Sequence, residues 1–176
     1  MMKLRDLLKK VNGLSVVSEH PALSAEVKRL CTNSHACSAG DLFIGMPGTR
    51  VDGGEFWQNA IDRGAIAALI SPEAAKKYPP GAEDCALEVP DLVTFCAQVA
   101  TAFYGYPAQQ LKMIGVTGTN GKTTTSHLIE FFLNKSQLHT ALLGTLYTRW
   151  RGFQKTAVHT TPFAVELQAQ LAEAVQ

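Results

Sequence analysis

Residues 117–125 constrain the fold and chemistry of this chain more than any other stretch. They read Thr-Gly-Thr-Asn-Gly-Lys-Thr-Thr-Thr. The apolar run 113–116 before them predicts a buried strand, and the periodic pattern that begins near Lys122 predicts a helix. A glycine loop between a strand and a helix is the arrangement that a phosphate-binding loop requires. The sequence therefore predicts a phosphate site.

Each part of this loop has a chemical reason. Gly118 and Gly121 adopt backbone angles closed to other residues, so that amide N–H groups can approach an anion. The following helix directs the positive end of its dipole to the same point, and Lys122 adds a full charge. We expect the hydroxyl of Thr123 to bind a magnesium ion that bridges the phosphates.

The loop departs slightly from the general pattern of phosphate-binding loops. That pattern has its first glycine at the position of Val116, whereas in this sequence the glycine is Gly115, one residue earlier. In this form the loop resembles the nucleotide loop of the Mur ligases, the ATP-dependent amide-bond-forming enzymes of bacterial peptidoglycan precursor synthesis, and of their folylpolyglutamate synthetase relatives. The resemblance implies a catalytic Lys122 and an ATP site. Its residues would be Gly118, Thr119, Asn120, Gly121, Lys122, Thr123 and Thr124. A glycine turn that binds nothing is the alternative.

Local patterns predict several short elements. Strands are expected over 14–17 and 27–30, and the spacing of apolar residues predicts amphipathic helices over 4–11 and 91–103. The Ser71-Pro72 pair, a cap followed by proline, predicts the start of a further helix. After the glycine loop and its helix, an apolar strand over 140–146 should complete a parallel strand-loop-helix-strand unit, and a hairpin through Arg151-Gly152 should follow it.

The N-terminal region predicts a βαβ unit. A strand over 42–46, a helix with apolar positions at Phe56, Ala60 and Ile61, and a continuous apolar strand over 65–70 follow one another. Ahead of them, residues 33–35 are small and polar, and from their chemistry alone they do no more than close a turn.

The residues around that turn carry a second resemblance. Asn33-Ser34-His35, then Gly40-Asp41-Leu42-Phe43, then Gly48-x-x-x-Asp52-Gly53-x-x-Phe56 are similar to the N-terminal domain shared by the Mur ligases that add the third amino acid and the terminal dipeptide. That domain holds the uridine diphosphate end of the substrate. Asn33 and His35 replace the family's usual Asp and Arg, whereas the serine is kept. The resemblance implies a substrate contact at Ser34, and further nucleotide contacts at Thr32, Thr49, Arg50 and Val51. A guanidinium such as that of Arg50 can pair with a diphosphate through two hydrogen bonds.

A third motif, His159-Thr160-Thr161-Pro162, stands before a periodic stretch. It predicts a helix capped by Thr161, with Pro162 at the first helical position. It also resembles a signature of the Mur ligase that adds the third residue. The resemblance implies that Thr160 and Thr161 contact the muramoyl dipeptide, with His159 beside them.

The bulk composition excludes several classes of protein. The 176 residues are 46% apolar and 18% charged, with a net charge of +1, which argues against a nucleic-acid-binding specialist. The four cysteines show no CxxC pair and indicate buried, reduced thiols. No signal peptide and no membrane-spanning run is recognisable, so we expect a cytoplasmic protein with no membrane partner.

We place a domain boundary after residue 108. Residues 1–108 would form an N-terminal α/β domain that binds the UDP-muramoyl substrate, and residues 109–176 the beginning of a parallel-sheet, P-loop ATP-binding domain. No aspartate follows Asp91, and the later glutamates, Glu130, Glu166 and Glu173, fall within predicted helices. An acidic magnesium ligand is therefore missing. We accordingly expect a fragment that is inactive alone. The resemblance implies a further portion with a carbamylated lysine, and a C-terminal domain that selects the amino acid.

These patterns together favour a monomeric, ATP- and Mg²⁺-dependent ligase. It would join meso-diaminopimelate or L-lysine to UDP-N-acetylmuramoyl-L-alanyl-D-glutamate through an acyl phosphate. The alternatives are the sister ligase that adds D-alanyl-D-alanine, a P-loop ATPase without ligase activity, and a UDP-sugar-binding module.

Overall fold

The computed structural model describes residues 2–12, 20–157 and 162–176, and it divides into two compact units, Met1–Phe103 and Tyr104–Gln176. The division falls before the expected boundary at residue 108. The reason is that the last helix of the first unit ends at Phe103, whereas the 3₁₀ turn η4 (Pro107–Gln110) packs on the last helix of the second unit. Each unit is described by itself.

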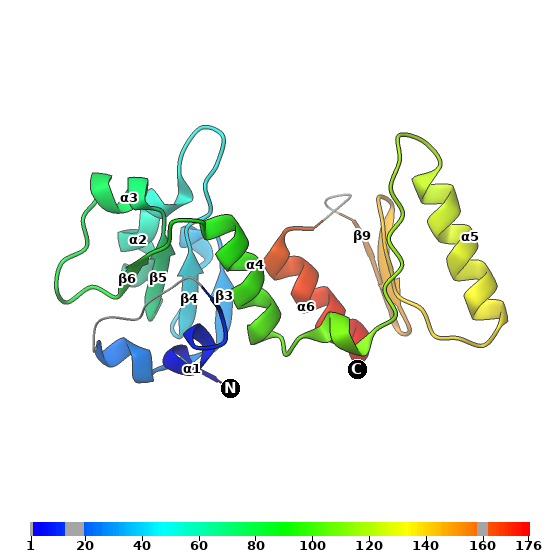
Figure 1. Ribbon diagram of the computed structural model, residues 1–176, viewed down its shortest axis with the longest axis horizontal. Helices are drawn as coiled ribbons and strands as arrows, with labels where there is room; N and C mark the ends of the chain where they lie inside the picture. The colour runs from blue at the N-terminus through cyan, green and yellow to red at the C-terminus, as the bar shows by residue number, and fades with distance from the viewer. Residues whose placement is uncertain (1, 13–19, 158–161) are drawn as a thin grey trace. The chain divides into compact units, whose positions relative to one another are not determined.

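The first unit is built on a parallel sheet of four strands in the order β3-β4-β5-β6 (Figure 1). Its strands are β3 (Arg29–Cys31), β4 (Asp41–Ile44), β5 (Ala67–Ile70) and β6 (Ala86–Glu88). Its helices are α1 (Leu4–Leu8), α2 (Trp57–Asp62), α3 (Pro72–Lys77) and α4 (Leu92–Phe103). Shorter elements are the antiparallel pair β1 (Met2–Lys3) and β2 (Glu26–Val27), and the 3₁₀ turns η1 (Pro21–Ser24), η2 (Ser34–Ala36) and η3 (Gly53–Phe56).

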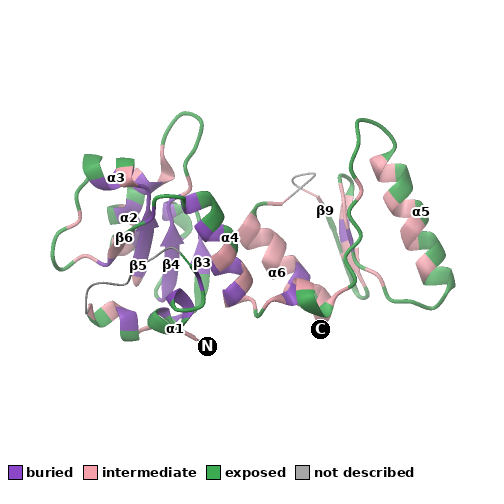
Figure 2. Cartoon of the chain, viewed as in Figure 1, coloured by how far each residue is buried: buried purple, intermediate pink, exposed green. Residues whose placement is uncertain are grey.

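The predicted βαβ unit is confirmed as β4, α2 and β5, and the first unit has the expected α/β architecture. In the register, Leu42 of β4 pairs with Leu30 on one side and Ala67 on the other. All residues of β4 and β5 are buried, which is typical of parallel strands covered on both faces (Figure 2). The single strand expected over 27–30 is wrong, because Val27 pairs with β1 and Arg29 opens β3. A strand expected over 14–17 lies outside the described residues.

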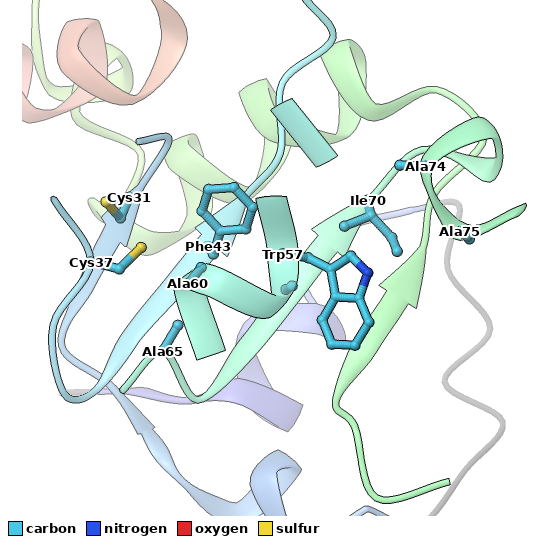
Figure 3. Packing of buried hydrophobic residues seen from close by; sticks show 10 residues of the cluster. Cys31, Cys37, Phe43, Trp57, Ala60, Ala65, Ile70, Ala74 and Ala75 are labelled. Atoms are coloured by element: carbon cyan, nitrogen blue, oxygen red, sulfur yellow. The ribbon is translucent and has the colours of Figure 1, made fainter. Parts of the chain in front are cut away.

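The two faces of the sheet carry different side chains, because successive residues of a strand point to opposite sides. Phe43, Ala68 and Ile70 belong to a cluster that also contains Trp57 of α2 and Ala74 of α3 (Figure 3). The opposite face carries Leu42, Ile44, Ala67 and Leu69, all completely buried. The helices α1 and α4 contact each other and carry the buried residues that are left to cover that face. The amphipathic pattern predicted for both helices is confirmed.

Local signals position the helices as the sequence predicts. Ser71 caps α3 by accepting a hydrogen bond from the amide of Ala74 at 3.0 Å, and Pro72 occupies the first helical position. Asp91 accepts from the amide of Thr94 at 3.1 Å at the start of α4. Both helices therefore begin where a cap satisfies amides that have no helical acceptor.

The second unit contains α5 (Lys122–Lys135), α6 (Ala164–Val175) and an antiparallel sheet, β7-β8-β9. Its strands are β7 (Leu142–Leu143), β8 (Tyr147–Trp150) and β9 (Phe153–Thr156). The predicted hairpin through Arg151-Gly152 is confirmed: Gly152 has φ +78°, and the rings of Trp150 and Phe153 stack across the turn at 4.2 Å. Within the described residues, no helix combines the length and apolar character that crossing a bilayer requires.

Three expectations for the second unit are wrong. Residues 113–116 form no strand, and Met113 and Ile114 are 58% and 60% exposed. The parallel strand-loop-helix-strand unit is absent from the described residues, because β7 pairs antiparallel with β8. A strand exists only where a neighbour completes its hydrogen bonds, and the described strands of this unit pair only with one another. Finally, α6 begins at Ala164 with Phe163 in N-cap geometry, so Pro162 precedes the helix.

Candidate functional site

The glycine loop of the second unit has the backbone that an anion site needs. Gly118 has φ +143° and Gly121 has φ +79°, a region that residues with side chains rarely adopt. A Cβ atom added at Gly121 would meet nothing within 4 Å, so its backbone angle and not a lack of space requires glycine there. Gly121 is the N-cap of α5, and its carbonyl accepts the amide of Thr125 at 2.8 Å. The preceding amides, of Lys122 to Thr124, have no acceptor within the helix.

Lys122 lies against its own loop. Its Nζ donates to the carbonyl of Gly118 at 2.6 Å and lies 3.4 Å from that of Thr119. The ammonium group therefore closes the loop and brings its positive charge to the helix N-terminus. Together with the amides that have no acceptor within the helix and with the hydroxyl of Thr123, it forms a donor set suited to phosphate oxygens. As predicted, the loop and the start of a helix coincide at Lys122.

The acidic side chain on α5 does not serve this loop. Glu130 is bound by Arg149 of β8, whose Nε donates to Oε1 at 2.8 Å and whose Nη2 makes a shorter contact with Oε2. The hydrogen bonds to Glu130 raise the pKa of Arg149. His127 lies 3.2 Å from the same guanidinium, and a hollow of about 680 Å³ beside these side chains extends toward the C-terminal half of α5. The ion pair holds α5 to the sheet, a role that the sequence did not predict for Arg149.

In the first unit, the structure brings the two predicted substrate segments to one edge of the sheet. Parallel neighbours β3 and β4 end at Cys31 and Ile44, so the residues that follow them emerge side by side. Thr32 and Ser34 follow β3, and the loop 46–52, with Thr49, Arg50 and Val51, follows β4. Loops that a rigid scaffold holds side by side are where binding residues are concentrated. Their contacts with a ligand stay predictions.

The predicted substrate residues of this edge differ in how far they are buried. Ser34 is only 5% exposed, whereas Thr32, Thr49, Arg50 and Val51 are exposed. Asn33 caps the turn η2, since its Oδ1 accepts the amide of His35 at 3.0 Å. The side chain of Asn33 therefore closes the turn that carries Ser34.

Three contacts that the sequence did not predict hold the loop 46–52 in place. Asp52 accepts the amide of Gly54 at 2.8 Å, and its other oxygen accepts the hydroxyl of Ser71 at the end of β5. Gly45 also approaches Gly54 so closely that an added Cβ would lie 2.3 Å from the Gly54 Cα. The loop is thus tied to the next strand and packed against the backbone of η3. Ser71 was recognisable only as a helix cap, because its contact with Asp52 joins residues far apart in sequence.

Arg29 and Asp41 form a charged pair at the first register position of β3 and β4. Arg29 Nε donates to Asp41 Oδ1 at 3.1 Å, and Nη2 approaches Oδ2 at 2.5 Å. Burial acts to raise the pKa of Asp41, but the bonds from Arg29 and from Ser38 outweigh it and hold that pKa below its ordinary value. Asp41 is 1% exposed, so this pairing keeps a charged carboxylate inside the protein.

The four cysteines are free, buried thiols, as the sequence predicts. Burial, with a hydrogen bond to Cys31, raises the pKa of Cys37 to about 12. Burial raises the pKa of Cys85 and that of Cys96 to about 11. A thiol held protonated is a poor nucleophile, so Cys37, Cys85 and Cys96 have no part in nucleophilic chemistry at neutral pH.

The third predicted motif, residues 159–162, falls largely outside the described part of the chain. His159, Thr160 and Thr161 lie outside the described residues. The proposed contacts of these residues with a muramoyl dipeptide remain predictions from the sequence.

Comparison with known proteins places both units in one family. Residues 26–104 match the Mur ligase family, catalytic domain, and residues 116–176 match the Mur ligase middle domain. A UDP-N-acetylmuramoyl-L-alanyl-D-glutamate–2,6-diaminopimelate ligase of Trichormus variabilis is 66% identical over 175 residues, 99% of this chain and 35% of that protein. The ligase of the same name from Synechocystis sp. is 67% identical over 156 residues, 89% of this chain and 31% of that protein. The chain thus spans about a third of the length of these relatives.

Solved structures support the same assignment. A structure of a UDP-N-acetylmuramoyl-L-alanyl-D-glutamate–2,6-diaminopimelate ligase superposes with a TM-score of 0.71 over 99% of this chain and 33% of its own, at 22% identity, which shows the fold. A MurF structure from Acinetobacter baumannii gives a TM-score of 0.61 at 26% identity over 97% of this chain and 32% of its own.

Proposed function

This chain belongs to the Mur ligase family, and we propose that it supplies the substrate-binding and phosphate-binding part of a ligase that joins 2,6-diaminopimelate to UDP-N-acetylmuramoyl-L-alanyl-D-glutamate. The observation that carries the proposal is the 66% identity, over 99% of the chain, to a relative of that name. This name favours diaminopimelate over L-lysine, and it favours third-residue addition over the sister reaction with D-alanyl-D-alanine.

We assign the uridine diphosphate end of the substrate to the carboxyl edge of β3 and β4. Ser34 offers a hydroxyl from a nearly buried residue that follows β3, and Arg50 offers an exposed guanidinium from the loop that Asp52 and Ser71 hold in place. A buried hydroxyl suits a uracil or diphosphate oxygen, and a guanidinium suits a diphosphate. The geometry supports this assignment because both segments emerge from neighbouring parallel strands.

We assign the phosphates of ATP to the loop from Gly118 to Thr124. The residues fit that group: two glycines with positive φ, three helix amides without helical acceptors, and an ammonium that already lies on the loop. ATP, when bound, would convert the D-glutamate side-chain carboxylate into an acyl phosphate, so that oxide is not the leaving group. Thr123 would offer its hydroxyl to Mg²⁺.

The chain's own residues would hold the phosphates and stabilise their negative charge. Lys122 would exchange its carbonyl partners, Gly118 and Thr119, for phosphate oxygens and stabilise the negative charge of the transferred phosphoryl group. The helix amides would hold the phosphates in line for transfer. Among the described residues, the magnesium ligand set is incomplete: Glu130 is bound to Arg149, and Glu166 accepts from Gln170 at 3.1 Å within α6. We therefore expect nucleotide binding by the 176-residue chain without amide ligation.

The first test is titration calorimetry of the 176-residue chain with UDP-N-acetylmuramoyl-L-alanyl-D-glutamate. We expect one site, with affinity lowered roughly ten- to a hundredfold by Arg50→Met, because a hydrogen bond to a charged group contributes about 1.5–3 kcal/mol. Arg63→Met is the matched control, since Arg63 is an exposed arginine at the end of α2, which leads to the opposite edge of the sheet. Equal losses for the two variants, or tighter binding of the muramoyl tripeptide, would contradict the proposal.

The second test measures ATP binding by Lys122→Ala and, as control, by Lys135→Ala at the other end of α5. Only the first substitution should remove binding, because only Lys122 lies on the glycine loop. Nucleotide binding that both variants retain would exclude the loop as the phosphate site. Amide ligation by the 176-residue chain would refute the argument from the incomplete magnesium ligand set.

A further inference from the structure

Two cysteines and an aspartate of the first unit meet inside the protein. The Sγ atoms of Cys31 and Cys37 and a carboxylate oxygen of Asp41 all lie within 4.8 Å of one another. Each cysteine is 7% exposed and Asp41 is 1% exposed. Figure 3 shows the two sulfur atoms side by side, one from the end of β3 and the other from the residue after η2. Neither thiol has a part in the proposed ligase chemistry.

The backbone turn between the two cysteines fixes this pairing. The carbonyl oxygen of Asn33 lies 3.2 Å from Cys31 Sγ and 3.6 Å from Cys37 Sγ, so both thiols use one acceptor. The turn itself is closed by the bond from the amide of Ala36 to the same carbonyl at 2.9 Å. The fold thus brings the two sulfur atoms together, within 4.8 Å of each other.

The surroundings indicate which ion would fit. Structural zinc sites take four ligands, but here the described residues supply two sulfurs, and Asp41 is engaged by Arg29 and by the amide of Ser38 at 2.9 Å. Two thiolates suffice for a soft ion that accepts low coordination, and Cu⁺ prefers such ligands. Burial of both thiols leaves little access for water as a further ligand.

A bound Cu⁺ would leave one negative charge at the site. On binding, each thiol releases its proton to solvent, and two thiolates with one Cu⁺ carry a net charge of −1. Arg29 holds its guanidinium against Asp41, the carboxylate that adjoins both sulfurs, and so places a positive charge beside that complex.

We propose that Cys31 and Cys37 form a binding site for one soft monovalent metal ion of the Cu⁺ class. Because the two ligands flank the turn that carries Ser34, a bound ion joins the two ends of that turn.

The test uses the reduced 176-residue chain without oxygen, titrated with Cu⁺ in competition with a colorimetric Cu⁺ chelator. We expect one equivalent to be taken from the chelator by the wild-type chain, and that equivalent to be lost in Cys31→Ser and in Cys37→Ser. Cys85→Ser and Cys96→Ser are matched controls, because each removes a buried thiol that lies outside this cluster. Native mass spectrometry with Ag⁺ should show one added metal and the loss of two protons.

Retention of the equivalent by either Cys31→Ser or Cys37→Ser overturns the proposal, as does its loss in a control variant or its absence from the wild-type chain. Trp57, which is 1% exposed in the same cluster, reports by its fluorescence whether each variant is folded. If a serine variant is unfolded, alanine at the same position replaces it, since alanine adds no polar group to the buried cluster.

Discussion

The substitution Gly45→Ala tests whether the close contact between Gly45 and Gly54 positions the loop 46–52. A Cβ at Gly45 would lie 2.3 Å from the Cα and 2.6 Å from the amide nitrogen of Gly54, whereas ordinary contact begins at 3.4 Å. The backbone must therefore move by roughly 1 Å, because no flexible side chain is there to give way. That movement strains the bond from Gly45 N to Leu69 O at 2.9 Å and the bond from Gly53 N to Met46 O at 3.0 Å.

The expected loss of stability follows from these contacts. Overpacking costs about 1–3 kcal/mol, and a weakened hydrogen bond adds about 1 kcal/mol, so the first unit should lose about 2–4 kcal/mol. With a urea m-value of about 1–2 kcal/mol/M, the unfolding midpoint should fall by about 1–4 M. Trp57 is the reporter, because it is buried in this unit and its Nε1 donates to the carbonyl of Tyr78 at 3.0 Å.

The measurement is urea unfolding followed by Trp57 fluorescence, in a Trp150→Phe background that leaves one tryptophan. The control is Gly81→Ala, the same chemical change at an exposed glycine where the new Cβ meets only the Asp84 carboxylate, at 3.3 Å. Its midpoint should move by less than about 0.5 M, because exposed substitutions change stability by about 0.5 kcal/mol or less. A Gly45→Ala midpoint that matches the control would refute the reasoning.

Two further predictions concern side chains that the sequence did not single out. Arg29→Met leaves the buried Asp41 carboxylate with Ser38 as its remaining side-chain partner among the described residues. The free energy of unfolding should fall by about 1–3 kcal/mol at neutral pH. The loss is smaller than for a fully buried pair because Arg29 is half exposed. In the folded protein the pKa of Asp41 lies below its ordinary value. The charged carboxylate therefore contributes to stability at pH values above the ordinary pKa, and this contribution is lost as the pH falls through the folded pKa. The substitution raises the folded pKa, so acid unfolding, followed by Trp57 fluorescence, should begin at higher pH; an unchanged acid midpoint would show that Arg29 does not hold the charge. Ser71→Ala removes both the cap of α3 and the contact with Asp52, and calorimetry should show about 1–2 kcal/mol lower stability together with weaker binding of the UDP-muramoyl dipeptide. Binding at full strength in a destabilised Ser71→Ala protein would mean that other contacts hold the loop.

Much of the first unit was predictable from local patterns. The apolar runs that became β4 and β5 are continuous, as strands buried on both faces require. The Ser71-Pro72 pair marked the start of α3 because its signal, a cap followed by proline, acts over one helical turn. The glycine loop and the start of α5 were predictable for the same reason: the chemistry needed lies within a few residues.

What the sequence missed depends on partners far along the chain. The run 113–116 is apolar enough for a strand, but the described residues give it no neighbour. The contacts of Asp52 with Ser71, of Arg149 with Glu130 and of Gly45 with Gly54 join residues that periodicity does not relate. For the candidate site, the sequence predicted the residues of both segments, but only the pairing of β3 with β4 brings them to one edge.

The order of strands in the first unit has a consequence for how its specificity can change. In sheets whose strand order reverses, the reversal opens a crevice at the carboxyl edge, and the ligand settles there. Here β3 to β6 follow one another without reversal, so the sheet offers no such crevice. The recognition surface must come from the loops themselves, chiefly the segment anchored by Asp52 and Ser71. Such a surface is separable from its scaffold: exchanging residues 47–51 between relatives should transfer ligand preference without redesign of the core.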